Sequence, residues 1–385
     1  MDLQLTTEQE EFRRDVCALL CDPQVAAEVE QVRRLTSDVE PCHLDVYRRL
    51  GARGWLAPNW PAQYGGLDRS IEEKAIVTEE LIAHGVPDIV HTLSIDIVGL
   101  ALNLFGTSGQ RQRWLPQLAA GESIGCVLLS EPDVGSDLPA LATRADPVEG
   151  GWRLHGRKLY NVKTHCADIG LCAARTSSSE NRYDGITVFI VPLRTPGVTV
   201  RRVPSVSDDG FCEVTFSGLV MTQDDVLGEV GAGWQVLNRT LPLERTGVEF
   251  EARARRELDA LIQRCEDDGA LADSVHAERL VELDADVRAG RLLTWRALSR
   301  LQAGHYEDVA YPMAKWHTTE TARSIAVLAS QVHGLDGALA AWDKDAPPGW
   351  MVEADYRDAP GYTLAAGTSE VMLSLIAADT VRQRD

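Results

Sequence analysis

The sequence predicts a mostly helical α+β protein, with an N-terminal helical domain, a middle antiparallel β-barrel or sandwich and a C-terminal four-helix bundle. Three observations predict this order. Apolar residues recur at helical spacing early in the chain, short β-branched runs alternate with turns in the middle, and helical spacing then returns. Because 385 residues exceed what one compact core usually holds, we expect three domains, residues 1–118, 119–228 and 229–385.

The N-terminal domain is expected to consist of helices. Thr7 and Glu10 have the spacing of a capping box, and apolar residues follow them at helical intervals. The segments 71–84 and 89–104 are apolar enough to form buried helices. A Pro/Gly loop at 61–66 separates these helices from the ones before them.

The middle domain is expected to be a small sheet. An apolar run at 124–129 is typical of a buried strand. Short runs rich in β-branched and aromatic residues follow at 151–156, 186–191, 197–200 and 211–216, with glycine-rich turns between them. Such regular spacing predicts an antiparallel barrel or sandwich.

The C-terminal domain returns to helical spacing. The segment 234–243 is expected to begin a helix that 245–266 extends with dense charge. Two further long helices are predicted over 280–301 and 314–328, and a Pro-rich break follows at 343–349. The sequence contains no internal repeat.

Composition excludes several classes of function. The net charge of −20 argues against binding to nucleic acid or insertion into anionic membranes, which need basic patches. No apolar run is long enough to span a bilayer, and the N-terminus lacks the pattern of a signal peptide. The eight scattered cysteines form no CxxC pair, and Cys17 and Cys21 lie four residues apart. We therefore expect a cytoplasmic protein with reduced cysteines and no metal site.

The run 129–137, Leu-Ser-Glu-Pro-Asp-Val-Gly-Ser-Asp, places hydroxyls, a glycine and a carboxylate in one turn after a strand. Such a turn presents N–H groups and hydroxyls to a ligand. It resembles the flavin-contacting segment of the acyl-CoA dehydrogenase superfamily. Further segments that resemble family motifs follow the same order along the whole chain: 61–66 (P-x-x-Y-G-G), 105–122, 156–158, 227–234, 331–337, 356–359 and 367–370.

The resemblance implies FAD as the cofactor. Tyr160 stands where the family stacks an aromatic ring on the flavin, whereas Val162 replaces a threonine hydroxyl that hydrogen-bonds near flavin N5. The segment around Gln331 resembles the part that contacts the ADP of a flavin shared with a neighbouring subunit. The residues expected to bind the cofactor are Leu129, Ser130, Gly135, Ser136, Tyr160, Asn161, Val162, Gln331, Gly334, Gly367, Thr368 and Glu370.

The same resemblance implies the reaction, in which a base removes the α-proton of an acyl thioester and the flavin accepts hydride from the β-carbon. Many members carry the base as the Glu of a Y-E-G-T sequence, but Ala366 stands at that position here. A second group carries it as the Glu of an E-R pair, which makes Glu244 the candidate catalytic base. Ser136, Arg245, Ala366 and Gly367 are the residues expected to contact the substrate.

One departure from the family leaves the assembly open. Where many homotetrameric members have an R-x-x-F-G motif that binds the flavin pyrophosphate, this chain has Glu266, Asp267 and Asp268. These acids would repel a diphosphate. We therefore keep three alternatives: a complete acyl-CoA dehydrogenase forming homodimers or homotetramers, a catalytically incomplete subunit of an α₂β₂ pair, and an enzyme for carrier-protein-bound acyl or aminoacyl groups or for N-oxygenation. An electron-transfer flavoprotein or a similar acceptor is the expected redox partner.

Overall fold

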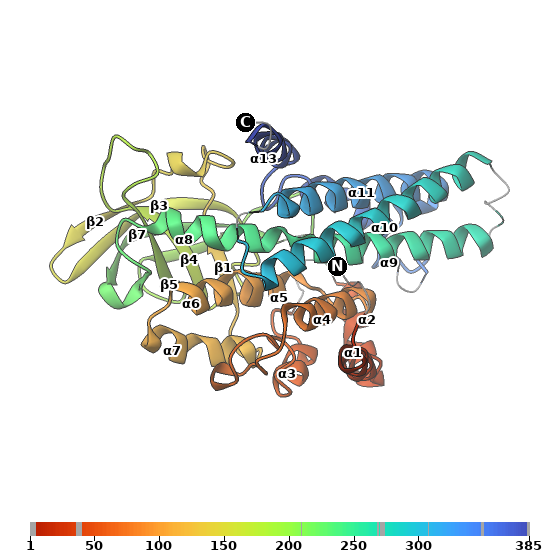
Figure 1. Cartoon of the computed structure of the whole chain (residues 1–385), viewed down its shortest axis with the longest axis horizontal. Coiled ribbons are helices and arrows are strands. Elements are labelled where there is room, and N and C mark those ends of the chain that lie inside the picture. The colour runs from red at the N-terminus through yellow and green to blue at the C-terminus, as the bar shows by residue number, and fades with distance from the viewer. Residues whose placement is uncertain are drawn as a thin grey trace.

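The computed structural model describes residues 5–35, 41–208, 210–267, 269, 274–306, 308–347 and 350–382. Figure 1 shows a sheet at one end of the molecule and the long helices α9, α10 and α11 at the other, with the N-terminal helices along one side. The predicted order of a helical region, a β region and a second helical region is confirmed. None of the described helices is both long and apolar enough to cross a membrane.

Capping boxes begin three helices of the N-terminal region. At each one, a hydroxyl accepts from the backbone N–H three residues on, and that residue's side chain accepts in return: Thr6 with Gln9, Ser70 with Glu73, and Thr107 with Gln110. The predicted box at Thr7 was wrong by one residue. The helices of this region are α1 (Thr7–Leu20), α2 (Pro23–Arg33), α3 (Asp45–Gly51), η1 (Ala62–Tyr64), α4 (Ile71–Ala83), α5 (Ile89–His91), η2 (Thr92–Gly99), α6 (Leu100–Phe105) and α7 (Ser108–Ala119).

The buried helix predicted over 89–104 runs through α5, η2 and α6, and its centre is a π-helical stretch, η2. This stretch brings Ser94 to the first strand of the sheet, where its Oγ accepts from the Gly125 N–H at 3.0 Å. The contact fixes the start of the strand that leads into the 129–137 turn. A π-helical stretch of this kind often marks a functional region.

Eight strands of the described chain form one mixed sheet. Along the path β6-β7-β3-β2-β4-β5-β8 most neighbours are antiparallel, but β1 pairs parallel with β4. The predicted antiparallel arrangement was therefore only partly right, because β1 pairs with a distant strand rather than with the next one. The strands are β1 (Gly125–Leu128), β2 (Arg144–Val148), β3 (Gly151–Val162), β4 (Ile169–Arg175), β5 (Ile186–Pro192), β6 (Val198–Arg202), β7 (Phe211–Thr222) and β8 (Val226–Leu227), with the short helices η3 (Leu138–Ala140) and η4 (Gln223–Asp225) between them.

The helices α9, α10 and α11 pack with α12 around a common core that includes Leu258, Leu283 and Ile325. The helix expected to run on from 234 is interrupted, since η5 separates α8 from α9 and Gly247 adopts a positive φ of 81°. The helices of this region are α8 (Gly233–Thr240), η5 (Leu241–Thr246), α9 (Val248–Asp267), α10 (Ser274–Gln302), α11 (Ala310–His333), η7 (Asp336–Ala338), α12 (Val352–Tyr362) and α13 (Ser369–Arg382).

A disulfide joins Cys42, in the loop before α3, to Cys166, in the turn after β3. The prediction that all cysteines are reduced is therefore wrong for this pair. The two residues lie 124 positions apart in the sequence and their Cα atoms are 5.3 Å apart. Sequence spacing gives no sign of such a long-range pairing, whereas the fold brings the two Cα atoms within the range that a disulfide requires.

Candidate functional site

A buried ion pair holds the turn after β1 against β3. The Lys158 Nζ donates to the Leu129 carbonyl oxygen at 3.0 Å and to the Glu131 carboxylate at 2.9 Å. The same carboxylate accepts from the backbone N–H groups of Ala142 and Thr143. Burial alone would raise the pKa of Glu131, but Lys158 and these hydrogen bonds lower it. The turn is thus rigid at its base.

The outer part of this turn is open. Ser130 accepts from the Leu159 N–H at 2.9 Å through its carbonyl oxygen, while its hydroxyl has no partner among the described residues. Gly135 and Ser136 are exposed, and a Cβ at Gly135 would meet nothing within 4 Å. The backbone N–H groups of Gly135 and Ser136 donate no hydrogen bond within the described chain. Free amides and hydroxyls beside open space suit a ligand with phosphate or ring acceptors.

Tyr160 is presented by a bulge in β3. The pairing of β3 with β7 shifts register between Lys158 and Asn161, and Tyr160 has a φ of 61°. Tyr160 is 58% exposed, and its ring lies edge-on to Phe211, with 6.0 Å between the ring centroids. An exposed aromatic ring next to the open turn is a platform on which a flat cofactor can stack.

The two residues after Tyr160 differ in the hydrogen bonds that their side chains can make. Asn161 is buried, and one of the two Nδ2 hydrogens donates to the Cys212 carbonyl oxygen at 3.2 Å. Val162 is half-buried and carries no hydrogen-bonding group. The Val162 side chain therefore offers no donor where the family has a hydroxyl.

A second group of predicted residues gathers where η5 meets the turn between α12 and α13. The Arg245 Nε donates to the Ala366 carbonyl oxygen at 2.8 Å, across 121 positions of sequence. The backbone of Glu244 belongs to η5, one residue before Arg245, whereas the Glu244 side chain lies outside the described residues. The two positions considered for the catalytic base are therefore carried by segments that touch each other.

A second cation fixes this turn from the opposite side. Lys315 of α11 is fully buried, and its Nζ donates to the carbonyl oxygens of Tyr362 at 3.0 Å and Gly367 at 2.7 Å. Ala366 and Gly367 both have positive φ, 54° and 99°. Within the described chain their N–H groups donate to no acceptor. Two adjacent unpaired amides can stabilise a developing oxyanion.

The remaining predicted residues lie apart from these two groups. Thr368 precedes α13 and Glu370 lies in its first turn, where the backbone N–H and the Thr368 hydroxyl lower the pKa of Glu370. Gln331 and Gly334 are at the far end of α11, on the order of 24 Å along the helix from Lys315 at 1.5 Å per residue. They cannot act with the other predicted residues on the same small group of atoms within this chain.

The two groups of site residues are joined through α12. Arg357 bonds to the Asp208 carboxylate at 2.6 Å, and the Asp208 N–H donates to the Asp358 carboxylate at 3.0 Å. These contacts dock α12 on the loop between β6 and β7. The helical turn and the β domain are therefore held together as two walls of one region.

Several residues of this region carry no motif that the sequence analysis used. Burial raises the pKa of Glu249 to about 7 and also that of Glu251 to about 7, although Arg291 pairs with Glu251 at 3.4 Å. Glu249 lies in the first turn of α9, five residues after Glu244. For Glu249, the sequence predicts no more than a position in a charged helix, and it gives no sign of the raised pKa. Lys315 was likewise missed, since its partners are backbone carbonyls from a distant segment.

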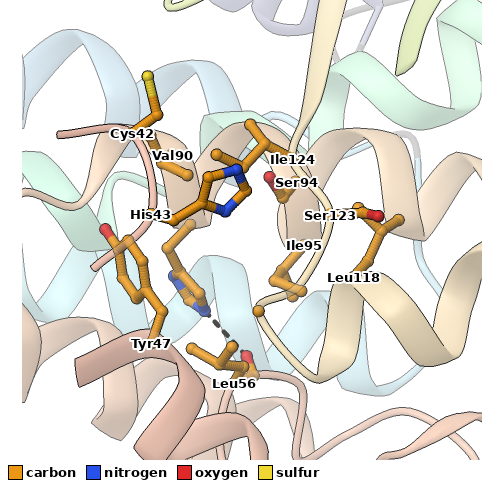
Figure 2. Close-up of a pocket in the computed structure, with 12 residues that line it drawn as sticks. Cys42, His43, Tyr47, Leu56, Val90, Ser94, Ile95, Leu118, Ser123 and Ile124 are labelled. Atoms are coloured by element: carbon orange, nitrogen blue, oxygen red, sulfur yellow. Dashed lines mark hydrogen bonds between the residues drawn. The ribbon is translucent and has the colours of Figure 1, made fainter. Parts of the chain in front are cut away.

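Two cavities lie in the described part of the chain, one too small for a ligand and one larger. The cavity in Figure 2, between His43, Tyr47 and Ile95, has a volume of about 20 Å³, which is room for one water molecule and not for a substrate. The ring of the buried His91, which also lines this cavity, is hydrogen-bonded through Nε2 to the Leu56 carbonyl oxygen at 2.8 Å. Burial lowers the pKa of His91. His91 is thus part of the buried interior, whereas His43 is half-buried.

The larger cavity, about 210 Å³, lies where α9 and α12 approach the end of β3 and the loop before α5. Its lining alternates cations with carboxylates, as in the pair of Arg253 with Asp88 at 2.9 Å. The Arg253 guanidinium also lies over the ring of Tyr362, 5.2 Å from its centroid. The cavity thus adjoins the 362–367 turn without being strongly basic.

Comparison with known proteins gives consistent matches along the whole chain. The family models described as acyl-CoA dehydrogenase N-terminal, middle and C-terminal domains match residues 6–122, 126–219 and 231–380. Among solved structures, the "Tcur3481-Tcur3483 steroid ACAD" superimposes with a TM-score of 0.90 at 25% identity, covering 99% of each chain.

Two relatives from Mycobacterium tuberculosis match over most of this chain. Acyl-CoA dehydrogenase FadE34 is 29% identical over 92% of the chain, which spans only 47% of the length of FadE34. Acyl-CoA dehydrogenase IpdE1 is 30% identical, with 86% of this chain and 85% of IpdE1 covered. The chain belongs to the acyl-CoA dehydrogenase family, whose members are FAD-binding oxidoreductases.

Proposed function

We propose that this chain catalyses the α,β-dehydrogenation of an acyl thioester, converting an acyl-CoA to a trans-2-enoyl-CoA with Glu244 as the base. The observation that carries the proposal is the 2.8 Å bond from Arg245 to Ala366. It joins the segment of Glu244 to a turn with two unpaired amides. A base and oxyanion donors on adjoining segments are what removal of a proton next to a carbonyl requires.

The residues on the β3 side fit a bound flavin. The exposed ring of Tyr160 offers a stacking surface, and the free amides of Gly135 and Ser136 offer hydrogen bonds beside open space. FAD, when bound there, supplies the hydride acceptor for the β-carbon. The Ser130 hydroxyl is the free side-chain donor nearest the start of the turn, which compensates in part for Val162.

On the helical side, each residue has a distinct role in the proposal. Glu244 removes the α-proton, and the N–H groups of Ala366 and Gly367 donate to the thioester oxygen as negative charge develops. Arg245 and Lys315 act as positioning residues, because they bind the carbonyl oxygens of Ala366 and Gly367. The backbone N–H groups of the same turn remain available to the substrate.

The second candidate is a catalytically incomplete subunit of a heteromeric enzyme. Val162 and the exposed acids Glu266 and Asp267 favour it, since they weaken the contacts that a flavin would otherwise have. The solved structure at 25% identity carries a name that joins two components. Helix α13 projects from the body in Figure 1 and exposes Leu373 and Leu375, as expected of a helix that packs on another chain.

The deciding experiment is anaerobic mixing of the purified, FAD-loaded chain with a panel of acyl-CoAs, followed by the flavin absorbance. The proposal expects the oxidised flavin band to bleach with at least one acyl-CoA. In the Glu244→Gln variant, the bleaching rate should fall by about 10²–10⁴-fold, the range that a positioned general base supplies. Activity that appears only after addition of a homologous second chain would support the heteromeric candidate instead.

The matched control is Glu249→Gln, which changes a second carboxyl of the same region with its pKa raised to about 7. Unchanged bleaching in Glu249→Gln together with loss in Glu244→Gln supports the assignment of the base. The opposite pattern would transfer the role of base to Glu249. A chain that binds no FAD, alone or with a homologous partner, would contradict both candidates.

A further inference from the structure

Two cysteines and a histidine converge at the end of α1, away from the site described above. Cys17 and Cys21 lie one helical turn apart, so both thiols are on one face of the helix. His84 caps the C-terminus of α4 and faces the same point. The two sulfurs are 3.9 Å apart, and His84 Nε2 lies 3.6 Å from the Cys17 Sγ and 3.4 Å from the Cys21 Sγ.

These distances match the edges of a tetrahedral zinc site. Zinc binds thiolate sulfur at about 2.3 Å and imidazole nitrogen at about 2.0–2.1 Å. In a tetrahedron, those bond lengths separate two sulfurs by about 3.8 Å and each sulfur from the nitrogen by about 3.6 Å. The three atoms are therefore arranged around a point that a zinc ion could reach with only small side-chain movements.

The orientation of the imidazole also suits a metal ligand. His84 Nδ1 lies 2.9 Å from the Glu80 carbonyl oxygen, an acceptor only, so Nδ1 carries the proton and donates it. The lone pair of Nε2 is then directed at the two sulfurs. A metal-bound histidine typically donates its other ring N–H to such a carbonyl or carboxylate, which fixes the tautomer and the plane of the ring.

We propose that Cys17, Cys21 and His84 bind a zinc ion, with water as the fourth ligand. Cys21 is exposed, so solvent can reach the fourth position. Sequence spacing gives no sign of this group, because His84 lies 63 positions away from Cys21. The site is independent of thioester oxidation.

The position of the site indicates a structural role. Arg13 of α1 already pairs with Glu79 and Glu80 of α4, so the ion would add a second link between the ends of the same two helices. A ligand that binds only the folded chain stabilises it, and the gain grows with the ratio of the free ligand concentration to Kd. We therefore expect zinc to raise the melting temperature and to leave acyl-CoA bleaching unchanged.

The test is titration of the full, chelator-treated chain with Co²⁺, which reports thiolate ligation by its charge-transfer absorption and tetrahedral geometry by visible bands at wavelengths where oxidised flavin is transparent. We expect one Co²⁺ per chain, displaced by Zn²⁺. Cys17→Ser, Cys21→Ser and His84→Ala should each weaken binding by at least about 100-fold, beyond the loss typical of a group that only orients a ligand. Because Cys21 is exposed, Cys21→Ser should keep the native circular dichroism.

A second group sets the matched control. Cys42, Cys166 and His165 also lie together, and reduction of the disulfide would free two thiols next to that imidazole. The variant Cys42→Ala/Cys166→Ala should therefore retain the cobalt spectrum. Loss of the spectrum in this variant, its persistence in Cys21→Ser, or the absence of Co²⁺ binding by the wild-type chain would each overturn the proposal.

Discussion

The candidate site has two walls, namely the 129–137 turn with β3 (the β3 wall) and η5 with the 362–367 turn (the helical wall). The contacts that hold these walls span very different distances along the sequence. On the β3 side, Lys158 joins a turn that lies 29 positions away. On the helical side, Arg245 and Lys315 bind the 362–367 turn from 121 and 52 positions away. The first wall is therefore local to one domain and carries a recognisable motif. The second is assembled only by tertiary packing, and it has Ala366 where many family members carry the base.

The comparison can be tested most strongly by moving the base from one segment to the other. Because Arg245 joins η5 to Ala366, a carboxylate placed at 366 should reach the same substrate atom as Glu244. We expect Glu244→Gln to lower kcat/KM by about 10²–10⁴-fold. The double variant Glu244→Gln/Ala366→Glu should have a kcat/KM at least about tenfold higher than that of Glu244→Gln. Steady-state kinetics with the best acyl-CoA measures both values.

Ala366→Glu in the wild-type background is the control for this experiment. Ala366 already has a positive φ, so the substitution adds no new backbone requirement. If the double variant binds FAD and keeps a native circular dichroism spectrum but regains no activity, then the two segments do not serve one substrate atom.

Substitution of each buried lysine should affect one wall of the site and leave the other intact. Lys158→Met leaves the buried Glu131 carboxylate without its cation, which typically costs about 3–5 kcal/mol of unfolding free energy. Lys315→Met removes hydrogen bonds to two neutral carbonyls, for which about 1–3 kcal/mol is expected. Urea unfolding measures both losses.

The functional readouts of the two variants should differ as well. Lys158→Met should weaken FAD binding, whereas Lys315→Met should slow flavin reduction by the acyl-CoA at unchanged FAD affinity. Lys158→Met/Glu131→Gln serves as the control, because it removes the unpaired charge and should recover part of the lost stability. Equal effects of the two lysine variants on FAD affinity would contradict the division into two walls.

The disulfide gives the third prediction, since Cys166 follows the β3 wall and ties it to the N-terminal region. A link that closes a loop of 124 residues is expected to contribute about 2–4 kcal/mol. Cys42→Ala/Cys166→Ala should lose this amount in urea unfolding and should show no further change when reductant is added. Equal stability of the wild-type chain with and without reductant would contradict a structural role for the bond.

The features that the sequence predicts fall mostly on the β3 wall, and those that it does not predict fall mostly on the helical wall. The order of the three regions and the β3 wall could be predicted, because helical periodicity, strand alternation and the 129–137 turn are local patterns. The cap at Thr6, one residue before the predicted Thr7, shows the limit of such patterns, since two adjacent threonines satisfy the same rule. The parallel pairing of β1 with β4 escaped prediction because it depends on a distant strand.

The helical wall and the cysteine chemistry could not be predicted in the same way. The Cys42–Cys166 bond and the Lys315 contacts join residues that share no motif. For Glu249, the sequence shows only a charged position on a helix, whereas its pKa depends on what the fold packs around it. Ala366 was noticed by comparison with the family motif, but its bond to Arg245 required the structure.

The smallest expected effect concerns Glu249 and the pH dependence of stability. Its pKa in the folded chain is about 7, against an ordinary value of 4.5, because burial outweighs a hydrogen bond from its own backbone N–H and the attraction of Lys74. Between these values the folded chain holds a proton that the unfolded chain has released, so stability falls as the pH rises from about 4.5 to about 7. Glu251, also near 7, adds a second such carboxyl.

Glu249→Gln should therefore flatten this decline without abolishing it. The slope should decrease by at most about 1.4 kcal/mol per pH unit, the value for one proton, and the Glu251 contribution should remain. Urea unfolding at pH 5.5 and pH 8 measures the difference, with Glu278→Gln, an exposed position on α10, as the control. The free energy of unfolding of Glu249→Gln should exceed that of the wild type mainly at pH 8. Parallel curves for the two proteins would mean that Glu249 is ionised in the folded chain, and a buried anion at that position would then need a cation nearer than Lys74.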